Sequence, residues 1–300
     1  MNITFRQLRL FLALADTGSV SAAARVLHVT QPTASMQLRE ITESVGLPLY
    51  EVIARKVYLT EAGQQLARTA RAIVDEWEGF GQTVNALQGL TRGRLRVAVV
   101  STAKYFVPRL LGSFCELHPG IDISLEVLNR DGVVQRLRDN RDDLYVMSMP
   151  PADVDLEDQT FLDNPLVMIA PVNHPLAGRK QLPLKALAGE RLILRERGSG
   201  TRLATDRFFE SQGFEPRTWL ELGSNEAIKE GVAGHLGVAV LSRHALKPED
   251  LGRELCLLPV TGMPIRSQWH VVHPRAKQLS PIARVFREHL LAQARHWPLV

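Results

Sequence analysis

Apolar positions in the first 45 residues follow a helical period in three successive blocks. Gly18 ends the first block, and either Ser19 or Ser21 can cap the second. Thr30 can cap the third, with Pro32 in its first turn, where a missing N–H is tolerated. The inward positions are Leu8, Phe11, Leu12 and Ala15, then Val20, Ala23, Ala24 and Leu27, then Ala34, Leu38, Ile41 and Val45. The pattern therefore predicts three short packed helices.

Only about three residues, 28–30, separate the second predicted helix from the third, and this arrangement is typical of a helix-turn-helix. The outward face of the third helix offers hydroxyls, an amide, apolar atoms and one cation, with no acid before Glu40. Such groups suit base edges in the major groove of DNA. The outward residues are Gln31, Pro32, Thr33, Ser35, Met36 and Arg39. The alternative is a helical bundle whose polar face is simply solvated.

Residues 49–60 predict a two-stranded wing after the third helix. Arg55 and Lys56 lie between apolar neighbours at its tip, where they can contact phosphate or the minor groove.

A long helix is expected next, because no proline occurs between Pro48 and Pro108. About 28 helical residues span roughly 42 Å, and one apolar stripe on so long a helix needs a partner. The pattern favours a second copy of the chain and leaves open packing against the helix's own domain. The stripe is Ala62, Leu66, Thr69, Ile73, Trp77, Phe80, Val84 and Leu87.

From Leu95 onwards, strand-like and helix-like runs alternate, which predicts a mostly parallel α/β sheet. The length suits two lobes of about 70–100 residues each. The chain is expected to cross between lobes near 163–165 and to return near 268–273. The runs are 95–100, 107–117, 123–128, 133–139, 144–149, 166–170, 182–187, 192–194, 202–212, 219–222, 227–233, 238–241, 255–260, 268–273 and 282–294.

Three polar segments, 101–105, 197–202 and 223–226, follow predicted strands of these lobes. Free N–H groups and helix dipoles at such positions favour anions. Lys104 and Arg202 add positive charge, so together the segments are expected to clamp a small carboxylate or phosphate ester; the alternative for each is simple helix capping. The candidate effector residues are Ser101, Thr102, Lys104, Asn129, Arg130, Ser148, Gly198, Ser199, Thr201, Arg202, Ser224 and Asn225.

Composition and charge set wider limits. Three hundred residues, 45% hydrophobic and 23% charged, suit a soluble globular protein of two or three domains. We find no apolar run of membrane-spanning length and no signal peptide, and Cys115 and Cys256 are the only cysteines. We therefore expect a cytoplasmic protein. The net charge of +4 permits a nucleic-acid partner without requiring one, since residues 1–60 hold six cations against four acids.

Catalytic motifs are not recognisable. Ser199 has glycine on both sides and so does not form a nucleophile elbow, and the glycines match no dinucleotide fingerprint. The histidine pairs His270/His273 and His289/His296 lack carboxylates or thiols at ligand spacing. We therefore expect no enzyme activity, no metal site and no cofactor.

Four N-terminal segments, 5–9, 18–24, 30–35 and 59–63, resemble the winged helix-turn-helix of LysR-type transcriptional regulators, and the resemblance continues through the chain. It implies that Gln31, Pro32, Thr33, Ser35 and Met36 lie at base-reading positions and that Arg39 and Arg55 contact DNA or its backbone. Many members carry arginine at the position of Met36, so apolar contact is expected there instead of a guanine contact.

The resemblance also implies a domain plan. An all-α winged helix-turn-helix would occupy 1–60 and a linker and dimerisation helix 61–91. An α/β effector domain with two lobes, like a periplasmic binding protein, would occupy 92–300. Lobe I is expected at about 92–163 and 271–300, and lobe II at about 164–270.

Segments 101–106, 142–147, 196–203 and 222–228 further resemble the CbbR group, whose members control carbon-fixation operons and respond to metabolites such as phosphorylated sugars, phosphoglycolate or NADPH. We therefore expect a regulator that binds promoter DNA sequence-specifically and responds to a small anionic metabolite of central carbon metabolism. It would be a homodimer through the linker helix, assembled into a homotetramer, with RNA polymerase left open as a partner. The competing hypothesis is a soluble small-molecule-binding protein or enzyme whose N-terminal helices serve only oligomerisation.

Overall fold

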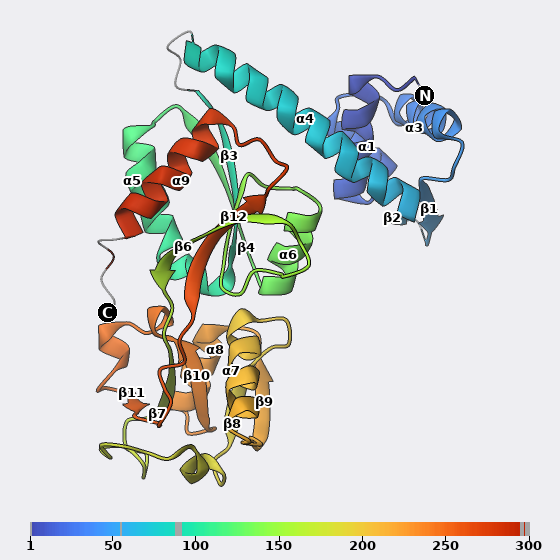
Figure 1. The fold of residues 1–300 in the computed structure, drawn as a ribbon. Coiled ribbons are helices and arrows are strands. Elements are labelled where there is room, and N and C mark those ends of the chain that lie inside the picture. The colour runs from blue at the N-terminus through green and yellow to red at the C-terminus, as the bar shows by residue number, and fades with distance from the viewer. Residues whose placement is uncertain (1, 55, 88–91, 295–296, 298–300) are drawn as a thin grey trace. The chain divides into compact units, whose positions relative to one another are not determined.

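The computed structural model describes residues 2–54, 56–87, 92–294 and 297, which form two compact units (Figure 1). The first unit contains the N-terminal helices and a hairpin, and the second contains two α/β lobes. In the described part of the chain, none of the helices is long and apolar enough to span a bilayer. The elements of the first unit are α1 (Phe5–Thr17), α2 (Val20–Val26), α3 (Gln31–Val45), β1 (Tyr50–Ile53), β2 (Lys56–Leu59) and α4 (Glu61–Leu87).

Local capping explains where the three short helices begin and end. Thr4 and Gln7 form a capping box at the start of α1, and Gly18 ends that helix in the left-handed conformation with φ 63°. Ser19, and not Ser21, caps α2 through the Ala22 N–H. Thr30 accepts the Thr33 N–H at the start of α3, as predicted.

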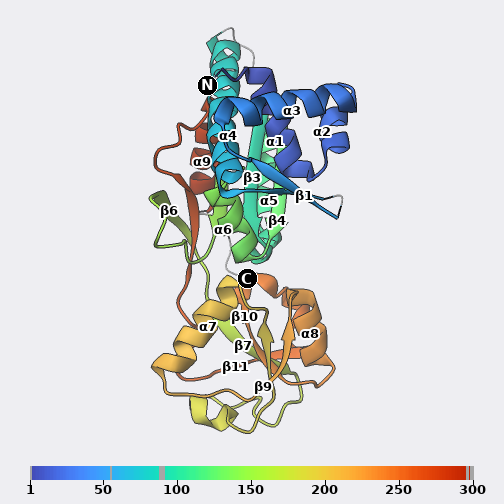
Figure 2. The same ribbon diagram turned by 90° about the vertical axis from the view of Figure 1, so that its right-hand side faces the viewer.

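The core of this unit is made by the predicted apolar faces together with Leu10 and Leu14 of α1, which the sequence analysis did not select. Phe11, Leu14, Ala34 and Leu38 are all fully buried. β1 and β2 pair antiparallel, and the Val57 N–H donates to the Gly18 carbonyl, which fixes the hairpin to the end of α1. Figure 2 shows the hairpin projecting from the helices as the expected wing.

The apolar stripe predicted along α4 divides into two parts. Its first residues, Ala62 and Leu66, pack on the core of the same unit together with Ala67 and Ala70, which lie off the predicted stripe. Further along, three large apolar side chains are exposed: Ile73 by 44%, Trp77 by 63% and Phe80 by 60%. The start of the helix therefore packs on its own domain. The later turns keep large apolar surface exposed, and pairing with a second copy of the chain stays a prediction.

Lobe I is built on a five-stranded sheet of order β4-β3-β5-β12-β6. β3 runs parallel to β4 and β5, whereas β12 is antiparallel to β5 and β6. Its elements are β3 (Gly93–Val100), η1 (Ser101–Tyr105), α5 (Val107–Leu117), β4 (Ile121–Leu128), α6 (Arg130–Arg138), β5 (Leu144–Met147), β6 (Leu156–Asp163), β12 (Gln268–Pro274) and α9 (Pro281–Ala294).

Lobe II has a second five-stranded sheet, of order β11-β7-β10-β8-β9. β8 is parallel to β9 and β10, and β7 is antiparallel to β10 and β11. Its elements are β7 (Leu166–Pro171), η2 (Leu184–Leu187), β8 (Leu192–Arg195), α7 (Gly200–Ser211), β9 (Thr218–Leu222), α8 (Asn225–Ala233), β10 (Val238–Ser242), η3 (Arg243–Ala245), η4 (Pro248–Asp250) and β11 (Leu255–Leu258).

Alternate residues of the lobe II strands enter two separate cores. Met168, Leu194 and Val240 pack in the cluster that includes Phe209 of α7. Their neighbours Ile169, Ile193 and Ala239 pack in the cluster that includes Ile228 of α8. Because successive strand side chains point to opposite faces, α7 and α8 cover opposite faces of the sheet. This arrangement explains why these strands read as continuous apolar runs.

Two connections join the lobes, from β6 to β7 and from β11 to β12 (Figure 1). They are tied together by hydrogen bonds from the Asn164 N–H to the Ser267 carbonyl, 2.8 Å, and between Leu166 and Ile265 in both directions. The sequence analysis missed β6. It expected the return to lobe I near 268–273, and β12 pairs with lobe I strands from Gln268 onwards.

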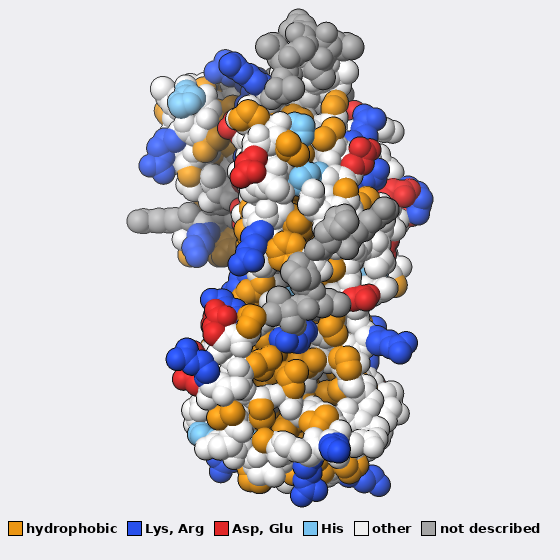
Figure 3. Space-filling view, turned by 90° about the vertical axis from the view of Figure 1, so that its left-hand side faces the viewer, with side chains coloured by type: hydrophobic (Ala, Val, Ile, Leu, Met, Phe, Trp, Pro, Cys, Tyr) orange, Lys and Arg blue, Asp and Glu red, His pale blue; other side chains and the backbone are white. Residues whose placement is uncertain are grey.

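Figure 3 shows Lys and Arg side chains scattered over the visible face and not gathered in one patch, whereas hydrophobic side chains gather on the lower lobe, lobe II.

Candidate DNA-reading and effector-binding sites

The N-terminal half of α3 presents the predicted reading face. Gln31, Pro32, Met36 and Arg39 are exposed, Thr33 and Ser35 are half-buried, and the opposite residues Ala34 and Leu38 are buried. Met36 is 56% exposed, although methionine is among the residues most often buried. Thr30 and Pro32 set this geometry, because they begin the helix directly before the face.

Side chains of this face are paired within the helix. Gln31 Nε2 donates to Ser35 Oγ at 3.3 Å, and Arg39 Nε donates to Glu43 Oε1 at 2.8 Å. The hydrogen bond to Glu43 raises the pKa of Arg39. Because both partners of this ion pair are largely exposed, it contributes little to the stability of the helix.

The wing carries one predicted cation that the structure describes. Lys56 is exposed at the start of β2, opposite Ile53 of β1. Arg55, the other predicted contact, lies outside the described residues. The sequence analysis did not anticipate that Val52, Ile53 and Tyr58 of the wing would also be exposed.

A buried guanidinium lies at the boundary between the two lobes. Arg195, at the end of β8, is only 2% exposed. Its Nη1 donates to Asn225 Oδ1 at 2.6 Å and its Nη2 to Ser101 Oγ at 3.1 Å, and Glu196 pairs with it through both carboxylate oxygens. Asn225 in turn donates to Thr102 Oγ1 at 3.3 Å. Three predicted effector residues, from two lobes, are therefore joined through an arginine that the sequence analysis missed.

Glu226 makes a second connection between the lobes. It accepts hydrogen bonds from Tyr105 Oη at 2.7 Å and from Lys104 Nζ at 3.0 Å, both in lobe I. Burial alone would raise the pKa of Glu226, but the bonds from Tyr105 and Lys104 outweigh burial and lower that pKa to about 2. Burial and the adjacent Glu226 carboxylate also raise the pKa of Tyr105. Glu226 is therefore a carboxylate at every ordinary pH.

Two glycines let the lobes approach each other at a third place. Gly198 has φ +84°, and a Cβ there would lie 2.4 Å from Asp131 Oδ2. A Cβ on Gly200 would lie 2.7 Å from Ser148 Oγ. A side chain at either position would have to displace Asp131 or Ser148, and the positive φ of Gly198 also favours glycine where the loop before α7 meets lobe I.

A cavity of about 380 Å³ opens beside these glycines. It contains four of the predicted effector residues together with acidic groups that the sequence analysis did not assign. Its lining is Arg130, Asp131, Arg197, Gly198, Ser199, Arg202, Leu203 and Asp206.

The two cations that were expected to clamp the anion, Lys104 and Arg202, are each paired with carboxylates in this structure. Lys104 pairs with Glu226, and Arg202 pairs with Asp206 and Glu221. Burial alone would lower the pKa of Arg202, but its hydrogen bonds to Glu221 and Asp206 raise it. Internal carboxylates thus occupy the positions expected for an effector anion.

The remaining predicted residues divide between capping and the interlobe boundary. Asn129 accepts the Gly132 N–H at the start of α6. Ser224 caps α8, which is the role that the capping alternative gave to its segment. Ser148, Ser199 and Thr201 are buried beside the glycine loop. The sequence analysis did not select Tyr105, Glu196 or Glu226, although two of them stand within its polar segments. Among the described residues, no cluster of His, Cys, Asp and Glu could hold a metal ion.

Comparisons with known protein families decide the class. Residues 5–64 match the bacterial regulatory helix-turn-helix protein, lysR family, and residues 88–295 match the LysR substrate binding domain. The chain belongs to the LysR family of transcriptional regulators. It is thus a DNA-binding regulator and not an enzyme, and the competing hypothesis of a binding protein with oligomerising helices is wrong.

Similar proteins support this assignment along nearly the whole length of this chain. It is 44% identical over 291 residues to the HTH-type transcriptional activator CmpR of Synechocystis, which covers 97% of this chain and 96% of the relative. It is also 44% identical to a RuBisCO operon transcriptional regulator of Acidithiobacillus ferrooxidans, over 96% of this chain and 94% of that protein. These relatives confirm the expected resemblance to the CbbR group.

Two solved structures agree with the fold. The Synechocystis CcmR regulatory domain in complex with 2-PG is 49% identical, with a TM-score of 0.67 over 69% of this chain and 100% of that chain. Full-length OxyR from Pseudomonas aeruginosa is 21% identical, with a TM-score of 0.80 over 100% of this chain and 97% of that chain, and shows the fold alone.

Proposed function

We propose that this LysR-family regulator controls genes of carbon fixation or inorganic-carbon supply in response to a small phosphorylated acid bound between its lobes. The observation that supports this most directly is the 49% identity of its lobes to a regulatory domain bound to 2-PG, which is 2-phosphoglycolate. The CmpR and RuBisCO operon regulators, at 44% identity over nearly the whole chain, support the choice of genes.

The interlobe contacts suggest how such an anion acts. Lys104 and Arg202 are cations already held by carboxylates of lobe II, and Arg195 links Ser101 to Asn225 across the boundary. A phosphate that takes over these cations would replace Glu226 or Glu221 and rearrange the contacts between lobes. The effector changes DNA binding only if it prefers one arrangement of the lobes over the other.

We also propose that two chains pair through α4. Phe5, Ile73, Trp77 and Phe80 line an apolar groove of about 440 Å³, with Trp77 5.9 Å from both the Phe5 and the Phe80 ring centroids. A patch of large exposed apolar groups marks an interaction surface. A second copy suits it because two recognition helices one DNA turn apart can read a pseudo-palindrome. Assembly into a tetramer and contact with RNA polymerase remain further proposals.

DNA recognition is tested by a gel-shift assay in physiological salt, with DNA from upstream of the protein's own gene and from a carbon-fixation operon. We expect tight binding to at least one of them and much weaker binding to a scrambled sequence. Equal, weak binding to all fragments would refute sequence-specific regulation by this protein.

The effector is tested by calorimetric titration of the full-length protein with 2-phosphoglycolate and with glycolate, which lacks the phosphate. We expect binding of the phosphorylated acid only. Thr102→Ala and Arg202→Ala should weaken it at least about tenfold, the equivalent of one charge-assisted hydrogen bond, without loss of DNA binding. Arg217→Ala, an exposed cation of lobe II, is the control. We call Arg195 and the residues around it at the lobe boundary, Ser101, Thr102, Asn225 and Arg202, the effector cleft. Wild-type affinity in both variants would show that the effector binds elsewhere.

A further inference from the structure

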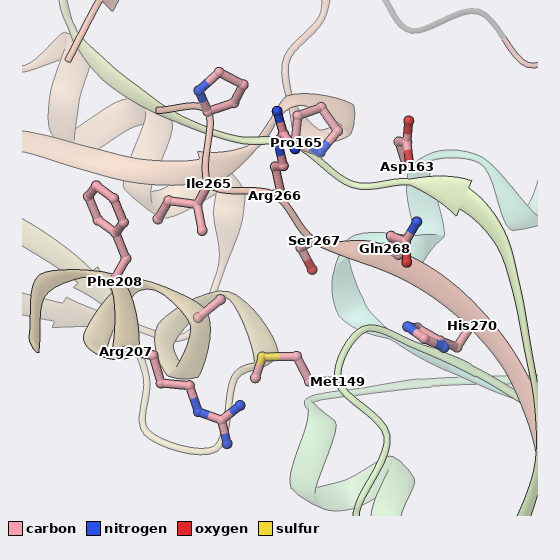
Figure 4. A pocket seen from close by; sticks show the side chains of 12 residues that line it. Met149, Asp163, Pro165, Arg207, Phe208, Ile265, Arg266, Ser267, Gln268 and His270 are labelled. Carbon is pink, nitrogen blue, oxygen red and sulfur yellow. The ribbon is translucent and has the colours of Figure 1, made fainter. Parts of the chain in front are cut away.

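A larger cavity, of about 970 Å³, lies between the lobes (Figure 4). It borders the β6–β7 and β11–β12 connections, which together we call the hinge. Its walls come from the two hinge connections near Pro165 and Ile265, from Phe208 of α7, and from Met149 after β5. None of the predicted effector residues lines it. Its volume is at the upper end of the range for small-molecule sites, and far more than phosphoglycolate fills.

One side of this hinge cavity is apolar. Phe208 and Ile265 lie next to each other in Figure 4, and the Met149 thioether points into the space between α7 and the hinge. All three side chains are half-buried, so each leaves apolar surface uncovered. A polarisable thioether beside an aromatic ring accommodates ligands of irregular shape. This wall suits the apolar body of an organic molecule.

The hinge cavity also contains two cations, Arg207 and Arg266. Neither makes a hydrogen bond or an ion pair with any residue that the structure describes, in contrast to Arg195 and Arg202. Arg207 also lies close enough to Arg130 to contribute, after burial, to the lowered pKa of Arg130. Asp163 is the one acidic residue in the lining, so the positive charges outnumber it and favour an anion.

Met149 lines this cavity and also contacts Arg130 of lobe I through its backbone. Its φ of +59° lies in the left-handed region, which is rare for a residue with a large side chain. Its carbonyl accepts Arg130 Nε at 2.8 Å, which fixes the backbone in that state. Backbone strain of this kind concentrates at ligand sites and switch regions.

We propose that the hinge cavity is a second ligand site, separate from the effector cleft, that binds an organic anion with an aromatic or other apolar body. Arg207 and Arg266 would hold the anionic group, and Met149, Phe208 and Ile265 the apolar body. Because the hydrogen-bonded hinge segments form one wall, a ligand here acts on the angle between the lobes. The protein would then combine two metabolic signals.

A matched pair of fluorescent probes tests this assignment on the full-length protein. The first, 8-anilinonaphthalene-1-sulfonate, is an aromatic anion, and the second, N-phenyl-1-naphthylamine, is the same framework without the sulfonate. We expect the anion to bind one site per chain. Arg207→Gln and Arg266→Gln should each lower the affinity for the anion about tenfold and leave the affinity for the uncharged probe unchanged. Phe208→Ser should lower the affinity for both probes.

The controls separate this site from the effector cleft and from unfolding. Arg217→Gln removes another exposed cation, on lobe II and outside the lining of this cavity, and should bind the anion like the wild type. Circular dichroism should show that every variant is folded. Displacement of the anion by saturating 2-phosphoglycolate would overturn the proposal, because the two sites would then be one. Wild-type affinity in Arg207→Gln, or equal weakening in Arg217→Gln, would overturn it too.

Discussion

Gly63, in the first turn of α4, is the position where the DNA-binding unit tolerates a side chain least. A Cβ at this position would lie 1.9 Å from the carbonyl oxygen of Leu49 and 2.9 Å from its carbonyl carbon, both of which are backbone atoms. Leu49 is fully buried, and its carbonyl accepts the Thr60 N–H at 3.1 Å. Gly63→Ala therefore forces α4 and the segment before the wing apart by roughly 1 Å, the order of distance that removes overpacking.

The cost can be worked out from these contacts. Overpacking of a closed site costs about 1–3 kcal/mol, and weakening of a buried backbone hydrogen bond costs about 1–3 kcal/mol. Alanine recovers about 1 kcal/mol over glycine inside a helix. We expect a net loss of about 3 kcal/mol in the stability of the N-terminal unit, which corresponds to an equilibrium shift of about a hundredfold.

Hydrogen–deuterium exchange of the full-length protein measures the opening of this unit separately from that of the lobes. Amides of α1 and α3 should exchange about a hundredfold faster in Gly63→Ala, with lobe peptides unchanged. The control is Gly79→Ala on the same helix, where a Cβ meets nothing within 4 Å and should stabilise the helix slightly. Exchange at the wild-type rate in Gly63→Ala, or equal damage in Gly79→Ala, would refute the close approach as the cause.

Three further predictions concern the interlobe contact, the dimer and the wing. The pKa of Glu226 is lowered to about 2, so its stabilising contribution is complete above the ordinary glutamate pKa and declines as the pH falls from there towards 2. In thermal melts between pH 5 and pH 2, Glu226→Gln should therefore lose less stability than the wild type. Parallel curves for the two proteins would contradict this. Trp77→Glu should shift the protein towards monomer in sedimentation velocity, while Trp219→Glu, exposed on lobe II, should leave it dimeric; an unchanged Trp77→Glu dimer would place the interface elsewhere. Lys56→Ala should lower the salt slope of DNA binding by about one unit and Lys185→Ala should not; identical slopes would remove the wing from the phosphate contacts.

Features set by neighbouring residues were predictable from the sequence. The caps at Thr30 and Gly18 depend on hydrogen bonds over three or four residues and on the conformational freedom of glycine. The apolar faces of α1 and α3 follow from the same short-range period. The family resemblance came from such local segments and was confirmed.

β6 shows where local reasoning failed. Its residues are mostly exposed and include Glu157, Asp158 and Gln159, so the segment has no apolar alternation. It is a strand because it pairs with β12, over a hundred residues away. Pairing partners at that separation are selected by the folded sheet and leave no trace in the local pattern.

The effector cleft was half predictable. The sequence placed hydroxyls, amides and cations after the strands. Ser101 and Thr102 follow a strand of lobe I and Asn225 follows a strand of lobe II, and the three do come together where the lobes meet. The tertiary structure alone decided that Arg195 is buried between them and that Lys104 and Arg202 are already paired with carboxylates. Charge pairing depends on distances of a few ångströms between segments that are remote in sequence, and no periodicity encodes those distances. The sequence by itself therefore determined the kind of regulator and the segments that face its ligands, whereas the packing of the lobes determined which groups are free to bind them.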